Sequence, residues 1–168
     1  MELGQAKVFY IMGVSGSGKS YIGKAFAEAM GIDFFDGDDF HPPANVAKMS
    51  EGHPLEDQDR LGWLLAINKF ANARLTKKST VIACSALKES YRTLLSKDLN
   101  GKVHWIYLKG AFELIYQRMQ QRDDHFMPSS LLQSQFDILE EPAEAVTIDI
   151  SLKPAQIIES LTSLYFGN

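Results

Sequence analysis

The stretch that decides the fold reads Gly13-Val14-Ser15-Gly16-Ser17-Gly18-Lys19-Ser20. It matches the pattern G-x-x-x-x-G-K-[ST] at every required position. Residues 8–12 before it form an apolar run of strand length, and residues 21–30 after it carry apolar side chains at helical spacing. Strand, glycine loop and helix therefore follow one another in the order that a phosphate-binding loop requires.

This loop has the residue types needed to hold a nucleoside triphosphate. Its three glycines allow a tight turn whose N–H groups point inward at the start of the next helix, where anions bind well. Lys19 can reach the β- and γ-phosphates, and the Ser20 hydroxyl can ligate Mg²⁺. The sequence predicts ATP and Mg²⁺ as ligands, with the nucleotide bound by Gly13, Ser15, Gly16, Ser17, Gly18, Lys19, Ser20 and Tyr21.

Composition sets limits on the class of protein. The 168 residues fit one domain, so we expect a single unit over 1–168. The net charge of −4 disfavours a nucleic-acid partner, and no apolar run has the length of a membrane span. The start lacks the pattern of a secretion signal, and the one cysteine, Cys84, fits a small buried residue in a reducing cytoplasm. We therefore expect a cytoplasmic protein with neither nucleic acid nor membrane as partner.

The chain alternates between strand-like and helical segments, which is typical of an α/β fold with a parallel sheet flanked by helices. One long helical segment could bury a single face. The predicted strands are 8–12, 32–35, 80–84, 103–108 and 146–150; the predicted helices are 21–30, 61–71, 89–95, 111–122, 129–139 and 154–165; the face of the long helix would comprise Leu61, Leu64, Leu65, Ile67, Phe70 and Ala71.

Asp36-Gly37-Asp38-Asp39 follows the second predicted strand directly. We expect these carboxylates at the carboxyl edge of the sheet, beside the phosphate loop, where ligands of such sheets bind. Strand alternation would point Asp36 and Asp38 the same way. Asp38 is the candidate base that orients an attacking hydroxyl, and Asp36 the candidate Mg²⁺ ligand. An acidic turn that only solvates a loop is the alternative, above all for Asp39.

Two absences narrow the class further. The third predicted strand, 80–84, ends without the aspartate that many P-loop ATPases use for Mg²⁺. The segment Asn68-Lys69-Phe70-Ala71 has alanine where a guanine-reading motif needs aspartate. Motor ATPases and switch GTPases are thus disfavoured, and a compact kinase of small metabolites remains.

A lid is expected at about residues 122–130, where a helical pattern gives way to a polar loop that ends at Pro128. Arg118 and Arg122 are four residues apart, so they would share a helix face. Arg122 could stabilise the charge on the transferred phosphoryl group, and both arginines could contact the nucleotide. His125 is a candidate substrate contact. A solvated basic helix end is the alternative.

Basic residues are also candidates for the acceptor site, expected within about residues 36–65 and beyond the third strand. A carboxylate-bearing substrate would need such cations, although each alone could be a surface charge. His41 could contact a sugar hydroxyl or simply pack against the prolines that follow it. The candidates for acceptor binding are Asp38, His41, Lys48, Arg60, Lys88, Arg92 and His125.

Beyond the phosphate loop, the motifs resemble those of the bacterial-type gluconokinases. The likeness runs through the segments 36–49, 55–60, 83–92, 125–128 and 135–142 and covers nearly the whole chain. It implies ATP-dependent phosphorylation of D-gluconate on its terminal hydroxyl, in a fold like that of shikimate and adenylate kinases, often as a homodimer. By the same likeness Asp38 orients the acceptor, Arg60 binds it and Arg122 is the lid arginine. A shikimate-type or nucleoside monophosphate kinase, or a non-catalytic nucleotide-binding regulator, remain the alternatives.

Overall fold

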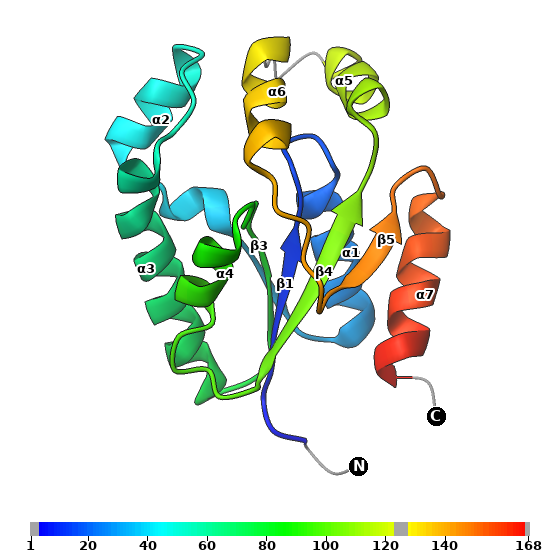
Figure 1. Ribbon diagram of the computed structural model, residues 1–168. Helices are drawn as coiled ribbons and strands as arrows, with labels where there is room; N and C mark the ends of the chain where they lie inside the picture. The colour runs from blue at the N-terminus through cyan, green and yellow to red at the C-terminus, as the bar shows by residue number, and fades with distance from the viewer. Residues whose placement is uncertain (1–3, 123–127, 167–168) are drawn as a thin grey trace.

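The centre of the molecule is a parallel five-stranded sheet in the order β2-β3-β1-β4-β5 (Figure 1). The computed structural model describes residues 4–122 and 128–166. The strands are β1 Val8–Met12, β2 Asp33–Asp36, β3 Thr80–Ala83, β4 Val103–Lys109 and β5 Val146–Asp149. All five predicted strands are confirmed, with bounds that shift by at most one residue.

Helices cover both faces of this sheet. Helices α1 and α7 pack together, as do α3 and α4; in Figure 1, α3 and α4 lie to the left of the sheet, α7 lies to its right, and α5 and α6 lie above the carboxyl ends of the strands. The helices are α1 Lys19–Met30, α2 Pro43–Ser50, α3 Asp57–Leu75, α4 Glu89–Leu95, α5 Phe112–Gln120, α6 Ser129–Ile138 and α7 Pro154–Phe166, with the short 3₁₀ helix η1 at Gly37–Phe40. The three-layer α/β arrangement expected from the sequence is confirmed.

Strand β1 lies in the middle of the sheet and has no solvated face. All five of its residues are buried, as expected for a strand covered by helices on both sides. Phe26 of α1 and Tyr165 of α7 both pack edge-on against Phe9, and their own ring centroids lie 5.9 Å apart. This central packing fixes β1, and therefore the loop that follows it, within the core.

The buried face of α3 differs from the predicted one. Leu61 and Leu65 are 46% and 41% exposed, so their assignment to the core was wrong. The helix begins four residues earlier, at Asp57, and buries Arg60, Trp63 and Asn68 beside its aliphatic residues. The polar groups of these three side chains are hydrogen-bonded, so they can be buried. Hydrophobic spacing alone had predicted leucines on the buried face instead.

Helix α2 was missed, because the Pro-Pro sequence was interpreted as a loop. Pro43 occupies the first helical turn, where the absent N–H costs nothing.

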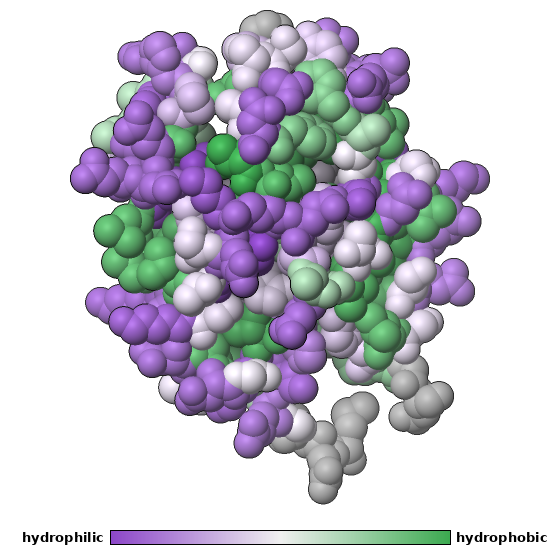
Figure 2. Space-filling model, in the orientation of Figure 1, coloured by the Kyte–Doolittle hydropathy of each residue, from purple (hydrophilic) through white to green (hydrophobic). Residues whose placement is uncertain are grey.

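Hydrophilic residues cover most of the molecular face shown in Figure 2, with smaller apolar areas between them. Across the described residues, none of the helices combines the length and apolarity that crossing a bilayer demands.

Candidate active site

A cleft of about 860 Å³ opens at the carboxyl edge of the sheet. The phosphate loop forms one wall, and η1, α2, α3 and α6 supply the others. Seven residues singled out from the sequence for catalysis, metal binding or acceptor binding line this one cavity: Lys19, Ser20, Asp36, Asp38, His41, Arg60 and Arg122.

The phosphate loop adopts a backbone that requires glycine. Gly16 and Gly18 have φ angles of +77° and +98°, in the left-handed region that side chains disfavour. A Cβ at Gly16 would also lie 2.5 Å from Cγ of Met119 on α5. The loop thus turns tightly under α5 and delivers the chain to the N-terminus of α1, which begins at Lys19.

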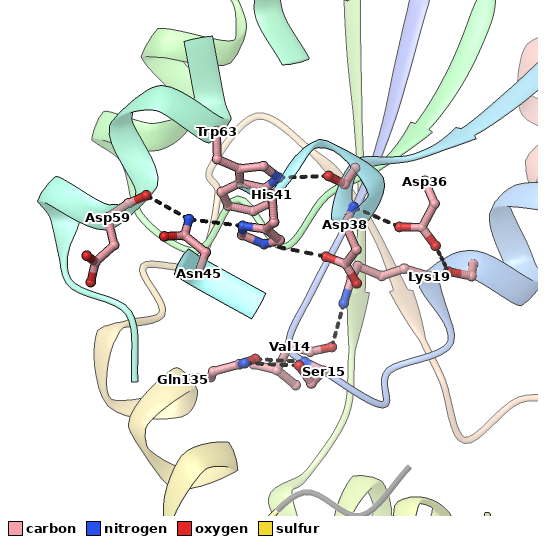
Figure 3. A network of polar contacts seen from close by, with 12 residues as sticks. Val14, Ser15, Lys19, Asp36, Asp38, His41, Asn45, Asp59, Trp63 and Gln135 are labelled. Carbon is pink, nitrogen blue, oxygen red and sulfur yellow. Dashed lines mark hydrogen bonds and ion pairs between the residues drawn. The ribbon is translucent and has the colours of Figure 1, made fainter. Parts of the chain in front are cut away.

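Lys19 lies half-buried at the head of the cleft. Its ammonium donates a 2.9 Å hydrogen bond to the carbonyl of Val14, which draws the side chain back over the loop (Figure 3). Burial lowers the pKa of Lys19, and the carboxylates of Asp38 and Asp36 oppose that shift. An anion bound in the loop would replace the Val14 contact with a stronger, charge-assisted one.

Ser20 and Asp36 meet at the end of strand β2. The Ser20 hydroxyl donates to Oδ2 of Asp36 over 2.6 Å, while Oδ1 accepts the backbone N–H of Asp38 over 2.9 Å. Hydroxyl and carboxylate oxygens are ligands that Mg²⁺ prefers. Among the described residues no group of three or more His, Cys, Asp or Glu side chains could hold a metal by itself, so this pair fits an ion whose other ligands are water and phosphate oxygens.

Asp38 lies in the 3₁₀ helix η1, not in an extended strand. The argument from strand alternation was therefore wrong, although Asp36 and Asp38 do line the same cleft. The cleft walls raise the pKa of Asp38 through burial, and Lys19 opposes the rise. The Asp38 side chain is nevertheless 74% exposed, so solvent screens both effects.

His41 packs against the aromatic ring of Trp63. Its imidazole stacks on Trp63 at a centroid distance of 4.0 Å, and the Trp63 indole donates to the carbonyl of Gly37 over 2.7 Å (Figure 3). Burial and then the charge of Arg60 lower the pKa of His41 to about 4. The ring is therefore neutral at physiological pH.

Arg60 is buried at the base of the cleft and is held by a chain of polar contacts. Its guanidinium donates to the Tyr91 hydroxyl over 2.9 Å, and Tyr91 in turn donates to Asp57. Lys88 closes the chain through a 2.9 Å ion pair with Asp57. The guanidinium of Arg60 therefore has a fixed support on one side and faces the cavity on the other.

Three predicted acceptor-binding residues do not line the cleft. Lys48 pairs with Asp59 over 2.7 Å, and Lys88 pairs with Asp57 as described above. Arg92 is buried and donates to the carbonyls of Ala86, Leu87 and Glu140. These cations are satisfied by partners within the protein, so the prediction that they contact the acceptor has no support from the geometry.

A second, smaller cavity of about 280 Å³ adjoins the phosphate loop on the side of α7. Tyr21, Arg118, Leu152 and Pro154 contribute to its walls. Arg122 borders both cavities, but it lies beyond α5, which ends at Gln120. The prediction that both arginines sit on one helix was therefore wrong, while their approach to the same pocket is observed.

Ser17 and His125 are the remaining site residues predicted from the sequence. Ser17 borders the smaller cavity, but the whole residue is only 2% exposed, so its side chain is buried and not free to contact a ligand. His125 and residues 123–127 of the expected lid lie outside the described residues, so these predictions stay predictions.

The sequence analysis missed Gln135 on α6, although it borders the cleft. Its side-chain oxygen accepts the Ser15 N–H over 2.7 Å, and its nitrogen donates to the Ser15 hydroxyl over 2.9 Å (Figure 3). Helix α6 is thereby tied to the phosphate loop. Asn45 and Tyr91 were missed as well, since nothing in their local sequence indicates the partners that the fold supplies.

Comparison with known proteins agrees with this geometry. A family model described as shikimate kinase matches residues 15–162. The thermosensitive gluconokinase of Escherichia coli K12 is 46% identical, over 90% of this chain and 83% of that protein. The gluconokinase of Arabidopsis thaliana is 40% identical, over 94% of this chain and 92% of that protein.

Two solved structures show that this chain is more similar to a gluconokinase than to a shikimate kinase. A gluconokinase from Sinorhizobium meliloti 1021 superposes with a TM-score of 0.83 at 43% identity, covering 96% of this chain and 97% of that one. A shikimate kinase from Acinetobacter baumannii in complex with shikimate reaches 0.57 at 19% identity, over 97% and 94% of the two chains, and so shares the fold alone. The chain belongs to the gluconokinase family, within the P-loop kinases of shikimate kinase-like fold.

Proposed function

We propose that this protein transfers the γ-phosphoryl group of ATP to the terminal hydroxyl of D-gluconate, giving 6-phospho-D-gluconate and ADP. The observation that carries the proposal is the meeting of three groups in one cleft: a phosphate loop with Lys19, a carboxylate at Asp38 and a buried cation at Arg60. These groups match the donor phosphates, the reacting hydroxyl and the substrate carboxylate. Membership of the gluconokinase family supports the same substrate.

The nucleotide site combines the phosphate loop with the smaller cavity. The N–H groups at the start of α1 and the ammonium of Lys19 bind the phosphates. The cavity bordered by Tyr21, Arg118 and Pro154 offers apolar and planar surfaces of the kind that a purine base stacks on. Ser20 and Asp36 would hold Mg²⁺, which neutralises charge on the phosphate oxygens when it is bound.

The acceptor is held from the opposite wall. Arg60 pairs with the gluconate carboxylate, a contact that a guanidinium can make with two parallel hydrogen bonds. Asp38 accepts a hydrogen bond from the terminal hydroxyl, orients its oxygen toward the γ-phosphorus and takes its proton as the new P–O bond forms. The bond to the bridging oxygen of ATP breaks in the same displacement, and ADP leaves.

Arg122 completes the site from the donor side. It borders both cavities, so its guanidinium can follow the charge that spreads over the transferred group. We propose that residues of about 122–130 act as the lid that excludes water from this step.

An acceptor panel in a coupled ADP-release assay tests the proposal. We expect rapid ADP release with D-gluconate and release near the no-acceptor background with glucose and shikimate. Glucose lacks the carboxylate that Arg60 would bind, and shikimate carries its hydroxyls on a rigid ring. Efficient turnover of shikimate with none of gluconate would reject the assignment.

We also propose a cytoplasmic homodimer built from one domain per chain. Leu61 and Leu65 support the dimer, because they form an exposed apolar pair one turn apart on α3. The single buried cysteine supports a reducing compartment. Sedimentation of the wild type beside Leu61→Glu tests the dimer, since a charge in this pair should shift the mass toward that of one chain.

A further inference from the structure

Asn45 lies behind the cleft and makes contacts that reach the reacting groups through His41. It is 4% exposed, and it occupies the first turn of α2. Its side-chain nitrogen donates to the carbonyl of Asp59 over 2.8 Å and lies 3.2 Å from Nδ1 of His41 (Figure 3). A buried amide with two neighbours at hydrogen-bond distance is a fixed element of the site.

The carbonyl of Asp59 decides which way this amide points. A backbone carbonyl can only accept, so the atom of Asn45 that faces it has to be the nitrogen. The second hydrogen of the same nitrogen then points at Nδ1 of His41, which has to accept. A neutral imidazole that accepts at Nδ1 carries its proton on Nε2.

Nε2 is the atom of His41 that faces the candidate base. It lies 3.9 Å from Oδ1 of Asp38, and the stacking of the ring on Trp63 keeps it in that direction. This separation is longer than a hydrogen bond. Since the Asp38 side chain is exposed, a small rotation about its own bonds closes the gap without moving the buried histidine.

We propose that Asn45 is a positioning residue that holds His41 in its Nε2–H tautomer, so that the imidazole donates a hydrogen bond to Oδ1 of Asp38 during catalysis. The other carboxylate oxygen is then free for the acceptor hydroxyl. The proposal rests on the proposed function for the identity of the reaction, but the tautomer itself does not depend on it.

The charged surroundings keep His41 in the neutral state that this role requires. Arg60 from α3 and burial together lower its pKa to about 4, while Asp38 is the carboxylate that approaches from η1. The carboxylate of Asp59 is turned to Lys48, with which it pairs over 2.7 Å. A neutral donor orients Asp38 without neutralising the negative charge that a base needs.

Nitrogen-detected NMR of the ¹⁵N-labelled wild type tests the tautomer directly, with the His41→Gln variant to identify the signals. Between pH 6 and 8 we expect a protonated Nε2 and a bare Nδ1. In Asn45→Asp, a carboxylate faces Nδ1 and attracts the proton to it. We expect the Nδ1–H tautomer, which leaves Nε2 without a proton to donate, a fall in kcat of about tenfold, as for one lost hydrogen bond, and an unchanged KM for ATP.

Asn68→Asp is the matched control. Asn68 is also a buried asparagine, and its amide donates to two carbonyls, those of Leu95 and Lys97, away from the cleft. It should lose stability while the His41 signals and kcat stay at wild-type values. A wild-type His41 protonated at Nδ1 would overturn the proposal even if Asn45→Asp does not fold, and so would a tautomer change in that variant without loss of kcat. A wild type that never phosphorylates gluconate would instead reject the proposed function, because the NMR measurement needs no substrate.

Discussion

The Tyr91 hydroxyl accepts a 2.9 Å hydrogen bond from the guanidinium of Arg60, 31 residues away in the sequence. The aromatic ring lies under the same guanidinium, 5.3 Å from it. Arg60 therefore points into the cleft because α4 supports it from behind, and this dependence can be measured.

The variant Tyr91→Phe keeps the ring and removes the hydroxyl. We expect KM for gluconate to rise about fivefold to tenfold, the effect of one buried hydrogen bond, while KM for ATP and kcat stay within about twofold. The control is Tyr10→Phe, which removes another buried hydroxyl, one that donates to the carbonyl of Leu95. An equal rise in KM in both variants would show that general destabilisation is the cause.

The variant Lys19→Met should fold normally and lose about 10²-fold or more in kcat, near 3 kcal/mol of transition-state stabilisation, because the ammonium that balances the charge of the phosphates is removed from the loop. Lys69→Met, an exposed lysine on α3, serves as control. Steady-state kinetics with saturating gluconate measure the effect, and near wild-type turnover in Lys19→Met would contradict the phosphate role.

Asp38 and its neighbour Asp39 form a natural pair for testing the base. Asp38→Asn should retain ATP binding in calorimetry and lose about 10²- to 10⁴-fold in kcat, since the amide cannot take the proton. Asp39 is exposed and lines neither cavity, so Asp39→Asn should behave as wild type. If Asp38→Asn fails to bind ATP, the residue belongs to the nucleotide site instead.

Gln135→Glu places a negative charge where an amide now contacts the phosphate loop. We expect KM for ATP to rise about tenfold, because the carboxylate repels the phosphates across a short distance. Gln133→Glu on the same helix is the control, since Gln133 is exposed and, within residues 4–122 and 128–166, its side chain bonds to Asp137 alone. If the two variants have equal kinetic constants, the contact between α6 and the phosphate loop does not contribute to nucleotide binding.

The lowered pKa of His41 makes stability depend on pH. In the unfolded chain His41 binds a proton below about pH 6.5, but in the folded protein only below about pH 4. The unfolded state therefore binds more protons within this window, and the free energy of unfolding falls as the pH drops through it. Denaturant titrations at pH 7.5 and 4.5 should show a loss that is about 2 to 3 kcal/mol smaller in His41→Gln than in the wild type. The variant His53→Gln, which changes an exposed histidine, should lose as much stability between these two pH values as the wild type.

The sequence predicted most reliably what depends on neighbours along the chain. The phosphate loop is a local motif, and its glycines stand where the backbone needs positive φ angles. The five strands are short apolar runs. Asp38 and Arg60 were placed in the correct cleft by their motifs. Helix α2 was missed because the Pro-Pro sequence at its start was interpreted as a loop. The exposed face of α3 was predicted wrongly because polar partners elsewhere in the fold decide which of its residues are buried.

The basic residues show why the rest could not be predicted. A lysine in a sequence does not reveal whether a carboxylate will reach it, and Lys88 meets Asp57 across 31 residues. Arg92 is occupied by the carbonyl of Glu140, 48 residues away. Gln135 reaches Ser15 across 120 residues. Each of these contacts depends on how elements distant in the sequence pack together, which the local sequence does not specify.

The central place of β1 has a consequence for how the chain is made. Of the five strands of this sheet it is synthesised first, yet its two partners begin only at Thr80 and Val103. At about 5–20 residues per second, the apolar strand waits roughly 5 to 20 s with an unpaired edge. During synthesis the same five residues that anchor the core are thus the segment most open to aggregation, and the segment that a chaperone would be expected to cover.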